Sequence, residues 1–532
     1  MPIVYAEPIR GWRFLLLNLA LGVGNVVVLS NVPGYTILAP YASGNLQGVT
    51  PSFGTWATTD HMIGMCIGFP IARWFVARFG DYRTLAVAYV LYAALSALCS
   101  VSDTIWFFVP ARFALGLAGG VILPVGQSLL LGEYPEKMRT VGVGLWGVLS
   151  MAPFTVGVFM GGWWAENFGW RSLFYSNIPI ALFAAAVVAA TFYGRGFRRR
   201  KARFDVVGVA LLAVLLLGVQ TIFNQGNDFD WLASPVLATI FLAVLVALPC
   251  FIVWEMGEKR PAIDVRLFAG RNYAVAMICS LAGFLCIQGI LSVFIGQLQL
   301  LLGYTSSRAG LVYLAMLLAA APLVAIVHEL CKGVDARLVA FLNFIGFAVV
   351  FTWLGLYDKF ASFDQIAAPM LFFGFMLATF FAPLATIAMS GLQGGRLIRA
   401  AEELTLLRTA FGAYGITLMG VVQFRRTPFH QLGLADHFGG WRSISLDAAR
   451  QFSDKLQANG LTEPMARGQM ARLLRQQASL LALDDAFLIA ACVFAALAVV
   501  VWFARPTFVR SRKAAPREEV LELEARELME QP

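Results

Sequence analysis

Charged residues are scarce in this 532-residue sequence, where Asp, Glu, Lys and Arg together make up 13%. A soluble protein carries about 25%. Hydrophobic residues make up 59% of the chain, and apolar runs of about 20 residues recur from end to end. One larger soluble core does not explain such runs, because each has the length that crosses a bilayer. The composition therefore predicts a polytopic membrane protein.

Three further absences exclude other classes of protein. No Gly-Lys dipeptide occurs, so a phosphate-binding P-loop is missing and any transport is ion-coupled or facilitated. The seven cysteines form no C-x-x-C pair, so neither a disulfide framework nor a zinc site is indicated. The four histidines lie in separate segments, which argues against a membrane-embedded enzyme. We expect no catalytic residues, no metal and no cofactor.

The net charge of +9 reflects basic residues that cluster in short loops. These loops are "ARFGDYR" (77–83), "YGRGFRRRKARFD" (193–205), "EMGEKRPAIDVRLFAGR" (255–271) and "GGRLIR" (394–399). Loops rich in Lys and Arg stay cytoplasmic, so the excess predicts topology and not nucleic-acid binding. Arg10 and Arg13 precede an apolar run that is longer than a signal peptide's, which predicts a retained first helix.

About fourteen apolar stretches have the length of a transmembrane helix. They fall near 14–38, 54–76, 84–102, 105–131, 140–163, 172–193, 205–224, 233–254, 273–300, 309–328, 337–357, 366–390, 408–424 and 486–504. With the N-terminus inside, the basic loops fall on the cytoplasmic side, and the even count returns the C-terminus to the cytoplasm.

Residues 425–485 form a polar connection that the count places outside. Within it, apolar residues of 464–483 recur near helical spacing. This segment is either a surface helix leading into the last span or a docking or substrate-access element. The acidic tail at 517–532 is expected to be solvated.

Asp60, His61 and Arg112 are ionisable residues inside expected spans, and polar Asn31 lies in a third span. At about 1.5 Å per residue, Asn31, Asp60 and Arg112 lie about 10 to 13 Å from the outer ends of their spans. A charge at this depth costs about 2.5–3.5 kcal/mol, so it requires a partner or a water-filled cavity. We therefore expect Asp60 and Arg112 to neutralise each other across two helices.

This expected pair has two interpretations. A proton could compete with Arg112 for Asp60, with His61 titrating near neutral pH, and so couple protonation to opening. Alternatively, Asp60 and Arg112 form a permanent structural pair. Adjacent residues point about 100° apart on a helix, so Asp60 and His61 cannot both face the same partner.

Neutral polar residues in the spans are candidates for a substrate cavity or for hydrogen bonds between helices. They are Gln127, Gln288, Gln297, Gln299 and Asn343, to which we add Asn31 and Trp146 as cavity residues. Glycines four residues apart, Gly64/Gly68 and Gly157/Gly161, are expected to let helices approach closely.

An ordered set of motifs runs through nearly the whole chain. It comprises "GNLQGVTPSFGTW" (44–56), "ARFALGLAGGVILPVGQSLLLGEYP" (111–135), "GGWWAENFGWRSLFYSNIP" (161–179), "PAIDVRLFAGRNYAVA" (261–276), "GYTSSRAGL" (303–311), "APLATIAMSGL" (382–392) and "LLRTAFGAYG" (406–415). In this order the motifs resemble the fourteen-helix drug–proton antiporters of the major facilitator superfamily, closest to the EmrB-like efflux permeases. Arg112 stands on the family's membrane arginine.

The resemblance implies an all-α carrier with two six-helix bundles and two extra helices between them. The corresponding units are 1–193, the linker helices at 194–272, the second bundle at 273–505 with its external segment, and a tail at 506–532. It also implies proton-driven export by alternating access across the inner membrane, with a periplasmic adaptor protein and an outer-membrane channel as partners. The residues that would serve the gate are Arg78, Gly80, Arg83, Gly157, Gly161, Gly162 and Arg408. Arg408 has an alternative interpretation as a residue that only packs between helices.

The chain departs from the family pattern at several motif positions. Asn31 stands where the family has an acid, and Val158 stands where it has a proline that permits a kink. Arg73 and Ala77 replace Gly and Asp in the loop motif, and Leu115 replaces Gln.

From these departures we infer that the titrating acid has moved to Asp60, with Arg112 kept as its partner. Two rivals remain open. One is a dedicated exporter of a siderophore or another anionic metabolite, and the other is a scaffold without transport.

Overall fold

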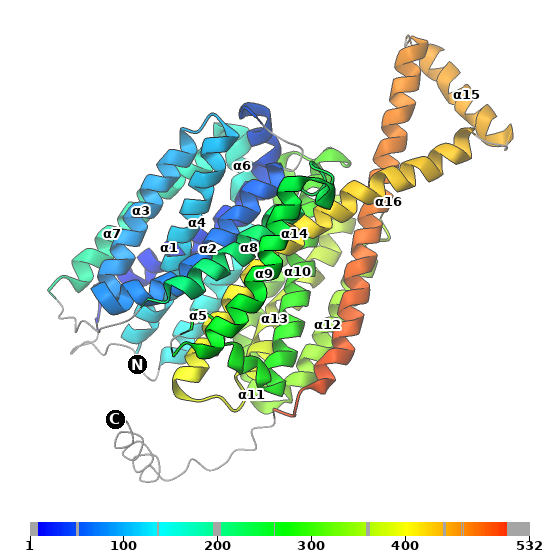
Figure 1. Cartoon of the computed structure of the whole chain (residues 1–532). Helices are drawn as coiled ribbons and strands as arrows, with labels where there is room; N and C mark the ends of the chain where they lie inside the picture. The colour runs from blue at the N-terminus through cyan, green and yellow to red at the C-terminus, as the bar shows by residue number, and fades with distance from the viewer. Residues whose placement is uncertain are drawn as a thin grey trace.

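Long helices make up the computed structural model, which describes residues 9–48, 53–135, 138–194, 204–259, 261–357, 362–439, 443–458, 460 and 462–507 (Figure 1). The first half contains α1 (Trp12–Asn45), α2 (Phe53–Phe79), α3 (Asp81–Ser100), α4 (Ile105–Glu133), α5 (Arg139–Met151), α6 (Val158–Phe168) and α7 (Ser172–Phe192). A π-helical turn, η2 (Pro153–Gly157), joins α5 to α6 in one span. The linker helices are α8 (Val206–Gln225) and α9 (Pro235–Gly257).

The second half contains α10 (Arg271–Leu300), α11 (Ser306–Gly333), α12 (Ala336–Leu354), α13 (Phe363–Met389), α14 (Gly394–Gly439), α15 (Ser443–Ala458) and α16 (Glu463–Val500). Among the described residues, 13 helices are long and apolar enough to cross a membrane. Together with the 28-residue α11 they match the fourteen expected spans one for one. The all-α polytopic fold is confirmed.

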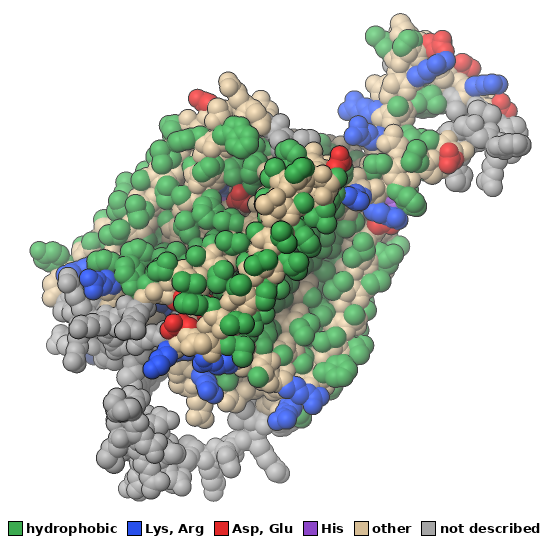
Figure 2. Space-filling view, in the orientation of Figure 1, with side chains coloured by type: hydrophobic (Ala, Val, Ile, Leu, Met, Phe, Trp, Pro, Cys, Tyr) green, Lys and Arg blue, Asp and Glu red, His purple; other side chains and the backbone are tan. Residues whose placement is uncertain are grey.

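Large apolar side chains on the outer surface indicate which faces meet lipid. On α9, Val236, Leu242 and Val253 are exposed by 67%, 59% and 72%. Figure 2 shows hydrophobic side chains covering the body, with Lys and Arg gathered at its lower end and on the protruding hairpin. A soluble protein does not expose apolar surface on this scale, so the belt identifies a multi-pass membrane protein.

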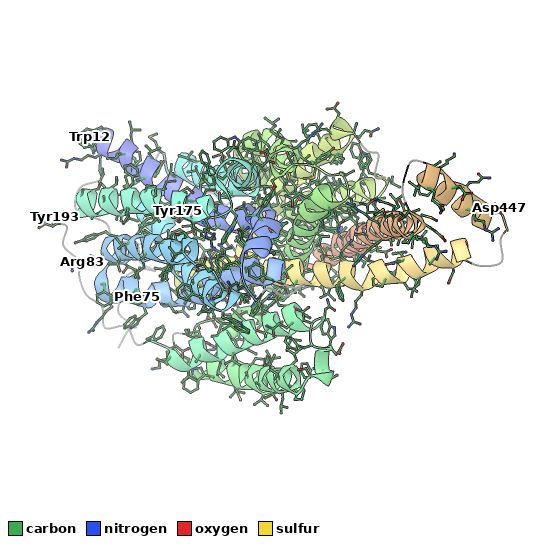
Figure 3. The ribbon with its side chains drawn as sticks, turned by 90° about the horizontal axis from the view of Figure 1, so that it is seen from above. Trp12, Phe75, Arg83, Tyr175, Tyr193 and Asp447 are labelled. Carbon is green, nitrogen blue, oxygen red and sulfur yellow. The ribbon has the colours of Figure 1, made fainter. Side chains whose placement is uncertain are left out.

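Helix pairs recur in the same pattern in the two halves of the chain. In the first half α2 packs on α4, α1 on α6 and α3 on α7. In the second half the corresponding pairs are α11–α13, α10–α14 and α12–α16. Seen from above, α8 and α9 form a pair at one side of the other helices (Figure 3), where α8 contacts both α2 and α14. The domain boundaries inferred from the resemblance stay a prediction.

A helical hairpin projects from one end of the body (Figure 1). We call this end of the body the hairpin end, and the opposite end, where α1 begins, the inner end. The hairpin consists of the last part of α14, then α15, then the first part of α16. The segment at 464–483 is helical as expected, and it is continuous with the last span in α16.

Contact between α2 and α4 depends on glycines that bring the two backbones together. A Cβ built at Gly116 would lie 2.1 Å from the carbonyl oxygen of His61, and one at Gly120 would lie 2.1 Å from that of Met65. On the α2 side, Gly64 and Gly68 lie equally close to α4. The expected role of these glycines in close helix approach is confirmed, and it fixes the position of His61 relative to α4.

Replacing Gly120 by alanine is expected to lower the thermal unfolding temperature of the purified protein. The added methyl group collides with backbone, and overpacking of this kind costs about 1–3 kcal/mol. Gly132 is the matched control on the same helix, because no atom lies within 4 Å of its Cβ position. Gly132→Ala should leave the unfolding temperature unchanged or raise it, and equal unfolding temperatures for the two variants would contradict the packing argument.

Candidate functional site

Arg112 is fully buried in the first half, and its guanidinium bonds only to neutral oxygens. It donates to the side-chain and backbone oxygens of Asn31 at 3.3 and 3.2 Å and to the backbone oxygen of Ala57 at 3.2 Å. The rings of Tyr35 and Phe174 lie 4.4 and 5.5 Å from its Cζ. Arg112 is therefore held between α1, α2 and α7 without a carboxylate.

Asn31 is the centre of the polar network around Arg112. Its amide nitrogen donates to the Tyr92 hydroxyl at 2.7 Å, and its side-chain oxygen also accepts from Asn177 at 3.3 Å. Asn177 donates in turn to Ser96. The expectation that Asn31 and Arg112 lie at one level is confirmed, because they are in direct contact.

The expected contact between Asp60 and Arg112 is wrong in this structure. His61, and not Asp60, faces α4, where its Nδ1 lies 3.1 Å from the carbonyl oxygen of Arg112. The reason is helical geometry: His61 is one turn from Ala57 and shares its face, whereas Asp60 is rotated away. The Asp60 carboxylate accepts a hydrogen bond from Trp56 and forms no ion pair with a described residue.

A polar chain that the sequence analysis missed begins next to Asp60. Asn224 of α8 donates to the Thr59 hydroxyl at 3.0 Å, and the Thr417 hydroxyl of α14 donates to Asn224 at 3.1 Å. Gln220 of α8 donates to Thr417 at 2.6 Å. These four residues, which we call the linker network, join both halves through α8. The one-turn spacing of Gln220 and Asn224 in an apolar helix is the signal that could have revealed them.

Some of the neutral candidates form hydrogen bonds between helices. Asn343 donates to the backbone oxygen of Met376 at 2.7 Å and to Thr379 at 2.6 Å. Gln297 accepts from Ser479 at 3.3 Å. Asn343 and Gln297 therefore join neighbouring helices of the second half.

The remaining neutral candidates differ from one another in their surroundings. Gln127 is exposed, whereas Trp146 is buried beside Gly126. Gln299 donates to Ser306 at 3.0 Å. Gln288 is buried on α10 and has no hydrogen bond to a described residue.

At the inner end, Arg73, which the family pattern does not contain, is one residue that links the halves. It donates to the backbone oxygen of Ala262 at 2.8 Å and lies 3.6 Å from the Glu402 carboxylate of α14. The predicted gate residues of this loop lie elsewhere. Arg78 is exposed, and Gly80, with a φ of 92°, directly precedes α3. Arg83 points outward and donates to the Tyr82 hydroxyl (Figure 3).

Toward the hairpin end, glycines of η2 and α6 bring this span against helices of both halves. A Cβ at Gly157 would lie 3.0 Å from Ser30 of α1, and one at Gly161 would lie 2.7 Å from the backbone oxygen of Gly34, which is also on α1. A Cβ at Gly162 would lie 2.4 Å from the Ser306 oxygen of α11. Val158 follows directly on the π-helical turn η2, so the span is irregular without a proline at that position.

Replacing Asn31 by leucine is expected to destabilise the protein, because buried Arg112 and Asn177 lose an acceptor. Leaving a charged donor unsatisfied costs about 1–3 kcal/mol or more. The measurement is thermal unfolding of purified protein, with Gln127→Leu as the control on an exposed amide. An unfolding temperature of Asn31→Leu equal to that of the control would show that the network contributes nothing.

Sequence comparison relates the chain to known transporters. The pattern of the Major Facilitator Superfamily matches residues 21–424. The multidrug export protein EmrB of Haemophilus influenzae is 28% identical over 505 residues, covering 94% of this chain and 98% of that protein. The fatty acid resistance protein FarB of Neisseria gonorrhoeae is 28% identical over 503 residues, with the same coverage of both chains.

Solved structures show the same fold at low sequence identity. The xylose transporter XylE from Escherichia coli, in a partially occluded inward-open conformation, has a TM-score of 0.55 and 13% identity, and the match covers 93% of this chain and 99% of that one. A bacterial homologue of the lysosomal transporter Spinster has a TM-score of 0.53 and 14% identity, with the same coverage.

Proposed function

The chain belongs to the Major Facilitator Superfamily, and from this premise we propose that it exports hydrophobic or amphipathic small molecules in exchange for protons. The relatives are transporters and not enzymes, and several are multidrug exporters. With its apolar helices, the chain is a multi-pass membrane protein of the type found in the bacterial inner membrane. We place the inner end in the cytoplasm, because Lys and Arg of the described residues gather there (Figure 2).

The observation that carries proton coupling is Asp60, a buried carboxylate in a membrane helix without an ion pair among the described residues. In a medium of low dielectric constant the charged form is costly, so the carboxyl group retains its proton until water reaches it. Opening and closing of the transporter changes that access. Asp60 therefore takes up a proton from one side and releases it on the other.

The surroundings of Asp60 suggest how its charge acts on the two halves. The adjacent Thr59 belongs to the linker network, which connects α2 to α8 and α14. A charge that appears on Asp60 alters the field at this network and draws water toward it. On the other side of α2, His61 contacts the backbone carbonyl of Arg112 through its Nδ1. From there, His61 and Arg112 act as modulators of the proton coupling.

Alternating access requires contacts between the halves to break at each end in turn. At the inner end these include the ion pair of Arg73 with Glu402. Toward the hairpin end, Glu166 of α6 accepts from the backbone N–H of Ser307 at 2.9 Å. Both are polar contacts between the halves that would have to break during alternating access. The hairpin is the surface we assign to a periplasmic adaptor protein, which would lead to an outer-membrane channel.

A second candidate function is export of an anionic amphipath. It is favoured by Arg408, which has no ion-pair partner among the described residues, and by the similarity to a protein named for fatty acid resistance. Such a cargo is also a hydrophobic or amphipathic molecule, and it differs in requiring a positive group in the substrate path. A siderophore or a similar acidic metabolite is included in this class.

Asp60→Asn is expected to abolish proton release when substrate is added to purified protein, while substrate binding persists. The amide cannot carry a proton across neutral pH, but it keeps the size and hydrogen-bonding capacity of the side chain. The measurement is the pH change in weakly buffered detergent solution, with a substrate taken from a toxicity screen. The control is Asp103→Asn, because Asp103 is exposed and pairs with Arg171 at the surface. Proton release from Asp60→Asn equal to that of the wild type would place the coupling group elsewhere.

A further inference from the structure

Arg408 lies in the membrane layer of the second half, on the face of α14 that meets α10 and α13. Its Cζ is 4.4 Å from the ring centre of Phe381 and 5.5 Å from that of Phe284. At about 1.5 Å per residue, Arg408 is about 20 Å along α14 from its first residue, and Phe284 is equally far along α10. This depth is within the hydrocarbon layer.

The guanidinium of Arg408 has no hydrogen-bond acceptor and no carboxylate partner among the described residues. Aromatic faces attract a cation, but they offer no lone pairs to its N–H groups. Arg112 differs, because its N–H groups reach oxygens of Asn31 and Ala57. An arginine at this depth whose donors are all available favours an anion that binds through two oxygens.

A second donor lies in the next layer of the same interface. Gln288 is one turn beyond Phe284 on α10, is only 8% exposed, and has no hydrogen bond to a described residue. Gly412 is one turn beyond Arg408 on α14, and a Cβ there would lie 3.1 Å from Cγ of Gln288. Because α10 and α14 pack side by side, the amide and the guanidinium belong to adjacent layers.

The phenylalanine rings beside Arg408 continue into a ring of the first half. Phe154 of η2, in the first half, meets Phe284 edge-on at 6.3 Å, and Phe381 of α13 lies 5.9 Å from Phe284. Phe154, Phe381 and Arg408 are each only half-buried, and the contact of Phe154 with Phe284 joins the two halves. A cation and an amide beside apolar rings suit a ligand with an acidic head and an apolar body.

We propose that Arg408 and Gln288 bind the carboxylate of an amphipathic anion, and that Phe154, Phe284 and Phe381 contact its apolar chain. This inference rests on the proposed export function and names the substrate class. It assigns the positive group of the substrate path to Arg408, since the donors of Arg112 already bond within the first half. Arg408 is then a specificity residue and not a gate residue.

The test compares two ligands with equal chains and opposite charge, decanoate and decyltrimethylammonium, for binding to protein in nanodiscs. Arg408→Gln is expected to weaken decanoate binding by about tenfold or more, since a charge-assisted contact is lost, and to leave the cation unaffected or tighter. Gln288→Leu should weaken decanoate less, by about threefold to tenfold. Arg425→Gln is the control, because Arg425 also lies over an aromatic ring, that of Trp231.

Arg408→Lys keeps the charge and checks for misfolding, and it should retain most of the preference for decanoate over the cation. The proposal is overturned if wild-type protein does not bind decanoate. It is overturned as well if Arg408→Gln weakens the binding of decanoate and of the cation equally, while Arg408→Lys keeps both its preference for decanoate and its affinity for the cation. It is also overturned if Arg408→Gln binds decanoate as the wild type does. Arg408-dependent binding without proton-coupled transport in proteoliposomes would contradict the export function alone, whereas coupled transport without Arg408-dependent binding would contradict only this site.

Discussion

A permanently charged guanidinium in the hydrocarbon layer must find oxygens, and this requirement organises the first half of the protein. Arg112 bonds to Asn31 on α1 and to the Ala57 backbone on α2, and it lies over Tyr35 and Phe174. These contacts place α1, α2, α4 and α7 around one point. The glycine-mediated contact of α2 with α4 has the same result, because it brings His61 against the Arg112 carbonyl.

The neutral partner of Arg112 has a consequence for coupling. Asn31 cannot titrate, so this partner of Arg112 carries no charge that a proton could change. The titratable carboxylate, Asp60, lies outside this network, next to the residues that join α2 with α8 and α14. Under the proposed proton coupling, positioning and proton binding are thus divided between two faces of α2. The linker helix α8 joins the two halves, because its side chains form hydrogen bonds with residues of both.

Several residues show why a site could be predicted only in part. The level of Asn31 and Arg112 followed from residue counts along helices, which fix depth. The partner of Arg112 depended on which face of α2 turns toward α4, and the glycines at 116 and 120 decide that rotation. Arg73 looked like a departure from a motif, yet it contacts Ala262 and Glu402. Its partners are more than 180 residues away in sequence, where no local pattern relates them.

The amino-acid sequence by itself determined that the chain crosses the membrane about fourteen times, because apolar length and basic loops act locally through the energy of transfer into lipid. It also determined the fold, through motifs that resemble those of a known superfamily. Only the tertiary structure decided which polar side chains meet. Hydrogen bonds in the hydrocarbon layer depend on helix rotation to within a fraction of a turn, and that rotation is set by packing between distant segments. Thus Asn31, and not Asp60, bonds to Arg112, while Arg408 remains beside phenylalanine rings with its donors available.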